Sequence, residues 1–194
     1  MNPPYKVFQV GFNKCGTRSL CQLFKQSGYD SVHYQKGRLA KKILQNFLRS
    51  RDILSGINKH TFYSDLECAY GSRGVPIYAY LLYKEIYYQY PNSKFILNVR
   101  PIDDWIRSRL RHSNRKYVRF CKKRLKLNKG EVVEEWKNHF HKHIEDVIGF
   151  FIDKPDRLLV YDISTDNPDK IINFFPELNL DISKWGHYGK TKKR

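Results

Sequence analysis

Two glycines five residues apart open the part of this sequence with the clearest chemical meaning. In the stretch VFQVGFNKCGTRSL, Gly11 and Gly16 have the separation of the phosphate-binding pattern G-x-x-x-x-G-K-[ST]. Thr17 and Arg18 stand where that pattern has a lysine and a hydroxyl residue, and the lysine of this loop is Lys14. Three interpretations follow: an altered nucleoside-triphosphate site, a different anion site, or a glycine-bearing turn that binds nothing.

The loop joins an expected strand to an expected helix, which is the context that a phosphate loop needs. Backbone N–H groups of residues 14–19 would converge on an anion there, and the helix dipole adds partial positive charge. Lys14 and Arg18 add cations, and Thr17 and Ser19 add hydroxyl donors. Triphosphate loops use the hydroxyl after their lysine to hold Mg²⁺, and an arginine at that place is a poor neighbour for a metal. The pattern therefore favours an anion bound without metal, which points away from kinases and NTPases.

A second anion site is predicted near Arg100, which directly follows the apolar run KFILNV. Ser108 lies eight residues further on, two turns into the expected next helix. In a parallel sheet both residues would lie near the carboxyl edge, where the glycine loop also opens. Two such sites suit a nucleotide that carries phosphates at both its 5′ and 3′ positions. The alternative is that Arg100 binds local carbonyl groups and Ser108 is an ordinary surface residue.

Together these motifs resemble the sulfotransferases that use 3′-phosphoadenosine 5′-phosphosulfate (PAPS). Their 5′-phosphosulfate loop has a Lys-x-Gly-Thr core, matched here by Lys14, Cys15, Gly16 and Thr17. Their 3′-phosphate motif is a hydrophobic strand, then Arg, then Ser eight positions later, as in residues 94–108. The wording KCGTRSL is similar to the carbohydrate-modifying branch, and the compact size resembles small microbial or viral members. The resemblance covers residues 6–112 and returns at residues 157–164.

The resemblance implies transfer of a sulfuryl group from PAPS to a hydroxyl or amine of an acceptor, with a glycan as one acceptor class. The product would be adenosine 3′,5′-bisphosphate (PAP), and no metal would be required. Lys14 and Thr17 would stabilise charge on the leaving phosphate, Arg18 would hold the 5′-phosphate, and Arg100 with Ser108 the 3′-phosphate. The donor-binding residues would be Asn13, Lys14, Cys15, Gly16, Thr17, Arg18, Ser19, Arg100 and Ser108.

An acceptor hydroxyl also needs a general base. His33 follows the second expected strand, where the carbohydrate branch has a catalytic glutamate, and Asp65 and Glu67 follow the third, where cytosolic members have a histidine. All three stay open as candidates. The adenine contact is also unassigned, because Ser19 replaces a stacking tryptophan of some members; Trp105 and Trp185 are the candidates. The C-terminal stretch with Lys190 is at most a partial copy of the family's glycine-rich 3′-phosphate segment.

The charge of the chain bears on its partners, because 36 Lys+Arg oppose 19 Asp+Glu for a formal net charge of +17. Anionic partners are therefore expected. The basic run of residues 107–126 either guides an anionic acceptor or is a solvated face. Nucleic-acid binding is a further alternative, with Tyr117 and Phe120 as stacking residues, although no nucleic-acid fold signature accompanies the run.

His139 and His143 are spaced for one metal ion but have no third ligand in view, so a polar helix face is expected. The rival functions are a P-loop kinase and a non-catalytic basic binding module.

These residues need a scaffold in which strands and helices alternate. Apolar runs KVFQVGF, DSVHY, TFYSDL, KFILNV and RLLVYDI read as strands, separated by segments of helical periodicity. PIYAYLLYKEIYYQYP reads as one buried aromatic helix, and residues 131–152 as a long helix. The sequence therefore predicts one α/β domain over residues 1–194, a three-layer P-loop-type fold with a mostly parallel sheet of about five strands. The four cysteines are scattered, so we expect free thiols. Because no signal peptide or membrane anchor is seen, we expect a cytoplasmic protein. The sequence does not indicate the oligomeric state.

Overall fold

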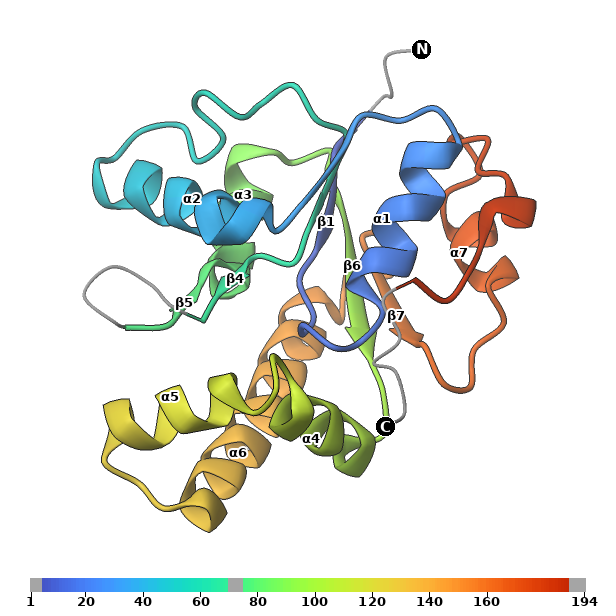
Figure 1. Cartoon of the computed structure of the whole chain (residues 1–194). Helices are drawn as coiled ribbons and strands as arrows, with labels where there is room; N and C mark the ends of the chain where they lie inside the picture. The colour runs from blue at the N-terminus through green and yellow to red at the C-terminus, as the bar shows by residue number, and fades with distance from the viewer. Residues whose placement is uncertain (1–4, 70–74, 189–194) are drawn as a thin grey trace.

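The computed structural model describes residues 5–69 and 75–188 and is built on a parallel β-sheet with helices on both faces (Figure 1). Five strands lie in the order β2-β3-β1-β6-β7, and every neighbouring pair is parallel. These strands are β1 (Val7–Gln9), β2 (Ser31–His33), β3 (Phe62–Ser64), β6 (Lys94–Val99) and β7 (Leu158–Asp162). The order changes direction beside the central β1, which is where open α/β sheets bind their ligands. The predicted α/β fold with a five-stranded parallel sheet is confirmed.

The sheet divides the core into two halves, and helices cover each half. Val7 and Ile96 pack toward α1 and α7, whereas the adjacent Phe8 and Phe95 pack toward α2, α3 and α6. Alternate strand residues point to opposite faces, so strands buried on both sides read as continuous apolar runs. The helices are α1 (Thr17–Gln26), α2 (Arg38–Leu48), α3 (Tyr83–Gln89), α4 (Ile102–Arg111), α5 (Lys116–Leu125), α6 (Lys129–Phe151) and α7 (Asp169–Phe174).

The segment predicted as a single aromatic helix is only partly one, so that prediction was wrong over its first half. Its beginning forms β5 (Ile77–Tyr78), which pairs antiparallel with β4 (Glu67–Cys68), and a 3₁₀ turn at Ala79–Leu82 leads into α3. Ile77 lies opposite Cys68 and is buried against the core. Pairing with β4 decides this conformation, and the helical periodicity of the segment itself carries no information on it.

The basic run of residues 107–126 forms two helices, α4 and α5, joined by a left-handed turn. Ser113, Asn114 and Arg115 all have positive φ angles, between 50° and 64°. The next helix, α6, begins with a capping box in which Asn128 and Glu131 exchange side-chain and backbone hydrogen bonds. This cap starts α6 two residues before the predicted position. Figure 1 shows α4, α5 and α6 grouped below the carboxyl end of the sheet.

The described residues bear on two further expectations. No helix within residues 5–69 and 75–188 is long and apolar enough to cross a membrane. All four cysteines lie in this part of the chain, all are buried, and none forms a disulfide.

Candidate active site

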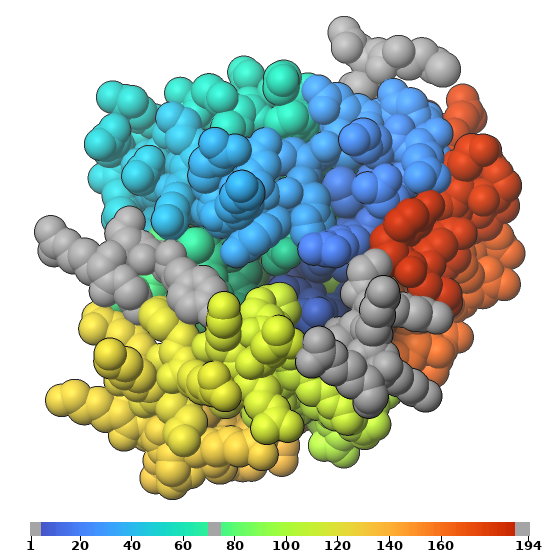
Figure 2. Space-filling view, in the orientation of Figure 1, coloured from blue at the N-terminus to red at the C-terminus, as the bar shows by residue number. Residues whose placement is uncertain are grey.

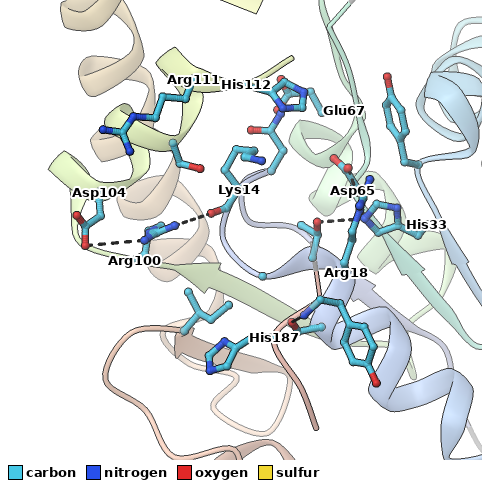
Figure 3. Close-up of a pocket in the computed structure, with 18 of the residues that line it drawn as sticks. Lys14, Arg18, His33, Asp65, Glu67, Arg100, Asp104, Arg111, His112 and His187 are labelled. Carbon is cyan, nitrogen blue, oxygen red and sulfur yellow. Dashed lines mark hydrogen bonds and ion pairs between the residues drawn. The ribbon is translucent and has the colours of Figure 1, made fainter. Parts of the chain in front are cut away.

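A cavity of about 1000 Å³ lies at the carboxyl edge of the sheet, between the loop after β1 and helix α4 (Figure 3). Its wall brings together residues that are far apart in the sequence. The predicted donor-binding residues on it are Asn13, Lys14, Gly16, Thr17, Arg18, Ser19, Arg100 and Ser108, and the three candidate bases His33, Asp65 and Glu67 also line it. The two predicted anion sites therefore belong to one cavity.

The glycine loop has the backbone shape of an anion cradle. Lys14 and Gly16 adopt left-handed φ angles of 66° and 77°, and α1 begins directly after Gly16 without a side-chain cap. The first amide N–H groups of a helix have no partner within the helix, and residues 16–19 at the start of α1 line the cavity, an arrangement that suits an anion. The left-handed φ of Gly16 favours glycine at this position, and a Cβ atom there would also displace the end of the Ile163 side chain.

Two buried amides that we did not single out from the sequence fix this loop. Gln9 Nε2 donates to Asn98 Oδ1, and Asn98 Nδ2 donates to the carbonyl oxygens of Phe12 at 3.1 Å and Cys15 at 2.6 Å. Both amides are fully buried. A Cβ on Gly11 would lie 2.2 Å from the Asn98 carbonyl oxygen, so Gly11 is needed for close packing against β6. Asn98 is the polar residue within the apolar run KFILNV.

The same amides connect the loop to the candidate base Asp65. The Asp65 backbone N–H donates to Gln9 Oε1 at 2.7 Å, in a turn where Asp65 has a φ of 54°. The glycine loop and the Asp65 turn are thus attached to one buried pair of side chains, which fixes their relative position.

Arg100 spans the cavity wall between the glycine loop and α4. Its Nη1 donates to the Lys14 carbonyl oxygen at 3.2 Å, and its Nη2 lies 3.8 Å from Asp104 Oδ2 (Figure 3). The Arg100 Nε is buried without a hydrogen-bond partner among the described residues. Ser108 is half-buried on the same wall, two turns into α4. An anion near these groups would find an available donor and a cation that is already oriented.

His33 and Asp65 form a pair beside Thr17. His33 Nε2 lies 3.1 Å from Thr17 Oγ1 and 3.6 Å from Asp65 Oδ2. Burial, followed by the nearby Arg18 charge, lowers the pKa of His33 to about 4. Burial and the charge of Glu67 raise the pKa of Asp65 to about 7, against the opposing effects of Lys14, Arg18 and Arg109. At neutral pH the imidazole is therefore neutral, and the Asp65 carboxyl is divided between its two protonation states.

Glu67 is placed differently, in a buried ion pair with Arg109. Its Oε1 accepts hydrogen bonds from Arg109 Nη2 at 3.0 Å and from the Tyr117 hydroxyl at 2.7 Å. Glu67 and Arg109 are 2% and 1% exposed, so the carboxylate is held in a buried ion pair. His112, another residue that sequence reasoning missed, also lines the cavity, and burial together with Lys14 lowers its pKa to about 4.

A comparison with protein families adds an independent observation to this geometry. The model of the sulfotransferase domain family matches residues 6–126, which is more than half of the chain. The chain belongs to the sulfotransferase family. No curated protein matches it in a sequence search. The matched region contains the glycine loop, the three candidate bases, Arg100 and Ser108, and it ends before α6.

Three side chains of this sulfotransferase that the sequence suggested as contacts to the donor are not placed to touch a ligand in the cavity. The Cys15 thiol is buried in the core, burial raises its pKa far above the ordinary value, and Cys15 does not line the cavity. Trp105 is also fully buried and donates its indole N–H to the Asn13 carbonyl oxygen at 3.0 Å, which prevents stacking on adenine. Trp185 packs edge-on against Tyr161 with ring centroids 5.8 Å apart and does not line the cavity.

The C-terminal segment supplies the remaining wall of the cavity. His187 and Tyr188 line it together with Ile163, and the Tyr188 N–H donates to Ser19 Oγ at 3.2 Å. Ser19 therefore binds the C-terminal segment with its side chain. Lys190, the predicted partial substitute for a 3′-phosphate segment, lies outside the described residues.

The histidine pair of α6 belongs to the core of the sulfotransferase. His139 Nε2 is 2.9 Å from the Tyr80 hydroxyl, and His143 Nε2 donates to the Val10 carbonyl oxygen at 2.8 Å. His143 is buried, whereas we had expected a polar helix face. Within the described part of the chain, no group of three or more His, Cys, Asp or Glu side chains is close enough together to hold a metal ion.

Proposed function

We propose that this sulfotransferase moves a sulfuryl group from PAPS to a hydroxyl or amine of an acceptor. The observation that carries the proposal is the single cavity onto which both predicted anion sites open. The loop offers backbone N–H groups and cations, and Arg100 offers a guanidinium on the wall between the loop and α4. A nucleotide with phosphates at its 5′ and 3′ positions suits this distribution of donors.

The donor set fits PAPS in its charge and in its unused hydrogen-bonding capacity. The N–H groups of α1, with Arg18 and Thr17, would hold the 5′-phosphosulfate, since helix N-termini bind such anions. Arg100, whose Nε is buried without a partner, would hold the 3′-phosphate together with Ser108. When bound, PAPS would supply a sulfuryl group that passes to the acceptor while the 5′-phosphate keeps the bridging oxygen.

Lys14 and Thr17 would stabilise the charge that develops on that bridging oxygen. Burial, together with Arg18 and Arg100, lowers the pKa of Lys14, while Asp65 opposes this. A partly desolvated ammonium interacts more strongly with a developing negative charge than a fully hydrated one. Lys14 is therefore expected to act on the rate of transfer more than on donor binding.

Asp65 is the group that we propose as general base. Its pKa of about 7 suits proton abstraction near neutrality, whereas the His33 pKa of about 4 makes the imidazole a weak base. His33, hydrogen-bonded to Thr17 and close to Asp65, would orient both groups. The acceptor proton would pass to an Asp65 carboxylate oxygen as the acceptor forms its bond to sulfur.

The activity can be tested with sulfur-labelled PAPS and a panel of glycan, phenol, peptide and lipid acceptors. We expect label to reach at least one acceptor class, and Lys14→Ala and Asp65→Asn each to slow that transfer strongly. Transfer at the wild-type rate in both variants would contradict the proposed site.

The surface beside the cavity favours an anionic acceptor. Residues 105–130 contain no Asp or Glu, and their exposed basic side chains are Arg107, Arg111, Arg115, Lys116, Arg119, Lys122, Lys123, Arg124, Lys126 and Lys129. Two of them, Arg107 and Arg111, also line the cavity. In Figure 2 the yellow-green and yellow surface of α4 and α5 borders the hollow that leads to the dark blue glycine loop. Tyr117 is fully buried, so the predicted stacking of nucleic-acid bases on it is wrong.

An acceptor pair that differs only in sulfation tests this surface. We expect Lys122→Ala/Lys123→Ala to raise the KM for a sulfated tetrasaccharide and to leave the KM for its neutral counterpart unchanged. Arg49→Ala/Arg51→Ala removes two exposed cations elsewhere and serves as the matched control. If both double variants change the KM for the sulfated acceptor equally, the basic surface is an ordinary solvated face and does not bind the acceptor.

A further inference from the structure

A buried ion pair at the cavity wall has no part in the chemistry proposed so far. Arg109 comes from α4 and Glu67 from β4, and Arg109 Nη2 lies 3.0 Å from Glu67 Oε1. The Tyr117 hydroxyl from α5 also donates to this oxygen, and Arg109 contacts the same hydroxyl. Glu67 Oε2 is buried without a hydrogen-bond partner among the described residues.

Aromatic rings enclose the cation of this pair. The Arg109 guanidinium carbon lies 4.7 Å from the ring centroid of Trp105, 4.8 Å from Tyr117 and 4.9 Å from Trp136. These rings come from α4, α5 and α6, so three helices hold one side chain. Cation–π contacts partly replace the lost hydration of the guanidinium, and the guanidinium cannot leave its position without disturbing all three helices.

Such a pair is a weak source of stability, because desolvating two charges offsets most of their attraction. Its position indicates another use. Glu67 lies two residues after Asp65, and the Asp65 backbone is fixed from the other side by Gln9. The short segment that carries the proposed base is thus attached at both ends, to the sheet through Gln9 and to the helices through Arg109.

We propose that Glu67 is a positioning residue for Asp65: anchored by Arg109 and Tyr117, it fixes the Asp65 turn and places a permanent negative charge beside the base. This inference rests on the proposed function, in which Asp65 accepts the proton. The charge of Glu67 makes Asp65 a stronger base than an isolated carboxylate.

The charged groups that face Asp65 come from every element around it. Lys14 and Arg18 approach from the glycine loop and α1, His33 from β2, Glu67 from β4, and Arg109 from α4. The three cations lower the pKa of Asp65, whereas Glu67 raises it and has the largest effect after burial itself. Removing the charge of Glu67 is therefore expected to lower the pH at which Asp65 ionises.

The experiment is an NMR pH titration of protein labelled with ¹³C at the aspartate carboxyl carbons, with the Asp65 signal assigned from its loss in Asp65→Asn. We expect Glu67→Gln to move the Asp65 midpoint down by about one pH unit and Glu67→Asp, which keeps the charge, to leave it in place. A role of Glu67 in folding alone predicts the same midpoint in both variants. An unchanged midpoint in Glu67→Gln, or a wild-type midpoint near the ordinary aspartate value, would overturn the proposal.

A second variant protects the test against a failure of Glu67→Gln to fold. Glu67→Gln/Arg109→Met removes both charges and leaves no buried ion unpaired. We expect its midpoint to fall by less than in Glu67→Gln, because loss of Arg109 partly offsets loss of Glu67; a midpoint at or above the wild-type value would overturn the proposal. The titration needs neither donor nor acceptor, so a failure of the proposed function, seen as a lack of PAP binding, is a separate result.

Discussion

Replacing Arg100 by alanine tests the assignment of the 3′-phosphate site. The side chain is 26% exposed, its Nε is buried without a partner, and it contacts the Lys14 carbonyl oxygen and Asp104. It is thus already oriented toward the cavity and can add a charge-assisted hydrogen bond to a bound phosphate. Only ligands that carry a 3′-phosphate should depend on this bond.

The size of the effect follows from the energy of such a bond. A hydrogen bond to a charged group contributes about 1.5–3 kcal/mol, and each 1.4 kcal/mol is a factor of about ten in affinity. Because Arg100 is mostly buried but shares its donors with Lys14 and Asp104, we expect a loss near the middle of that range. The dissociation constant of PAP should rise by about 30-fold in Arg100→Ala.

The assay is isothermal titration calorimetry with two ligands, PAP and adenosine 5′-monophosphate, which lacks the 3′-phosphate. The monophosphate should bind the wild type and Arg100→Ala with nearly the same affinity, and Arg49→Ala, an exposed cation on another helix end, should bind both ligands normally. If Arg100→Ala weakens both ligands equally, Arg100 does not contact the 3′-phosphate. If it weakens neither, the residue is not part of the donor site.

Three further predictions concern the base, the loop lysine and the packing of the loop. If Asp65 is the base, the rate should fall to about 1% of its plateau at pH 5, because its pKa is about 7; a rate that persists to about pH 4 would assign the role to His33. Lys14→Ala should lower kcat with PAPS by about 10²–10³-fold and raise the PAP dissociation constant by less; equal losses would make Lys14 a binding residue only. Gly11→Ala should lower the free energy of unfolding by about 1–3 kcal/mol in a urea titration, because its Cβ would lie 2.2 Å from the Asn98 carbonyl oxygen. An unchanged urea midpoint would contradict that close approach.

Much of the fold was predictable because its signals are local. KFILNV is buried on both faces, and an apolar run of that length indicates a covered parallel strand. The glycine loop stands between a strand and a helix, and Arg100 follows the end of a strand. Once parallel strands are expected, their carboxyl ends must share an edge, so the approach of Arg100 to the loop followed from topology.

The missing parts of the site depend on contacts between distant segments. Gln9 and Asn98 are 89 residues apart and meet only in the folded sheet, so neither amide is informative by itself. Arg109 is one of ten basic residues in residues 107–126, and nothing local separates it from its exposed neighbours. Its burial requires Glu67 from one side of the cavity and aromatic rings from three helices.

The most direct test of the central claim is thermal stabilisation by PAP without Mg²⁺, compared with ATP in the presence of Mg²⁺. A ligand at 100 times its dissociation constant stabilises the native state by about 2.7 kcal/mol, which raises the melting temperature of a domain of this size by about 5–10 °C. We predict that metal-free PAP produces this shift and that ATP with Mg²⁺ does not. Stabilisation by ATP that requires Mg²⁺, with no effect of PAP, would contradict a PAPS-dependent sulfotransferase.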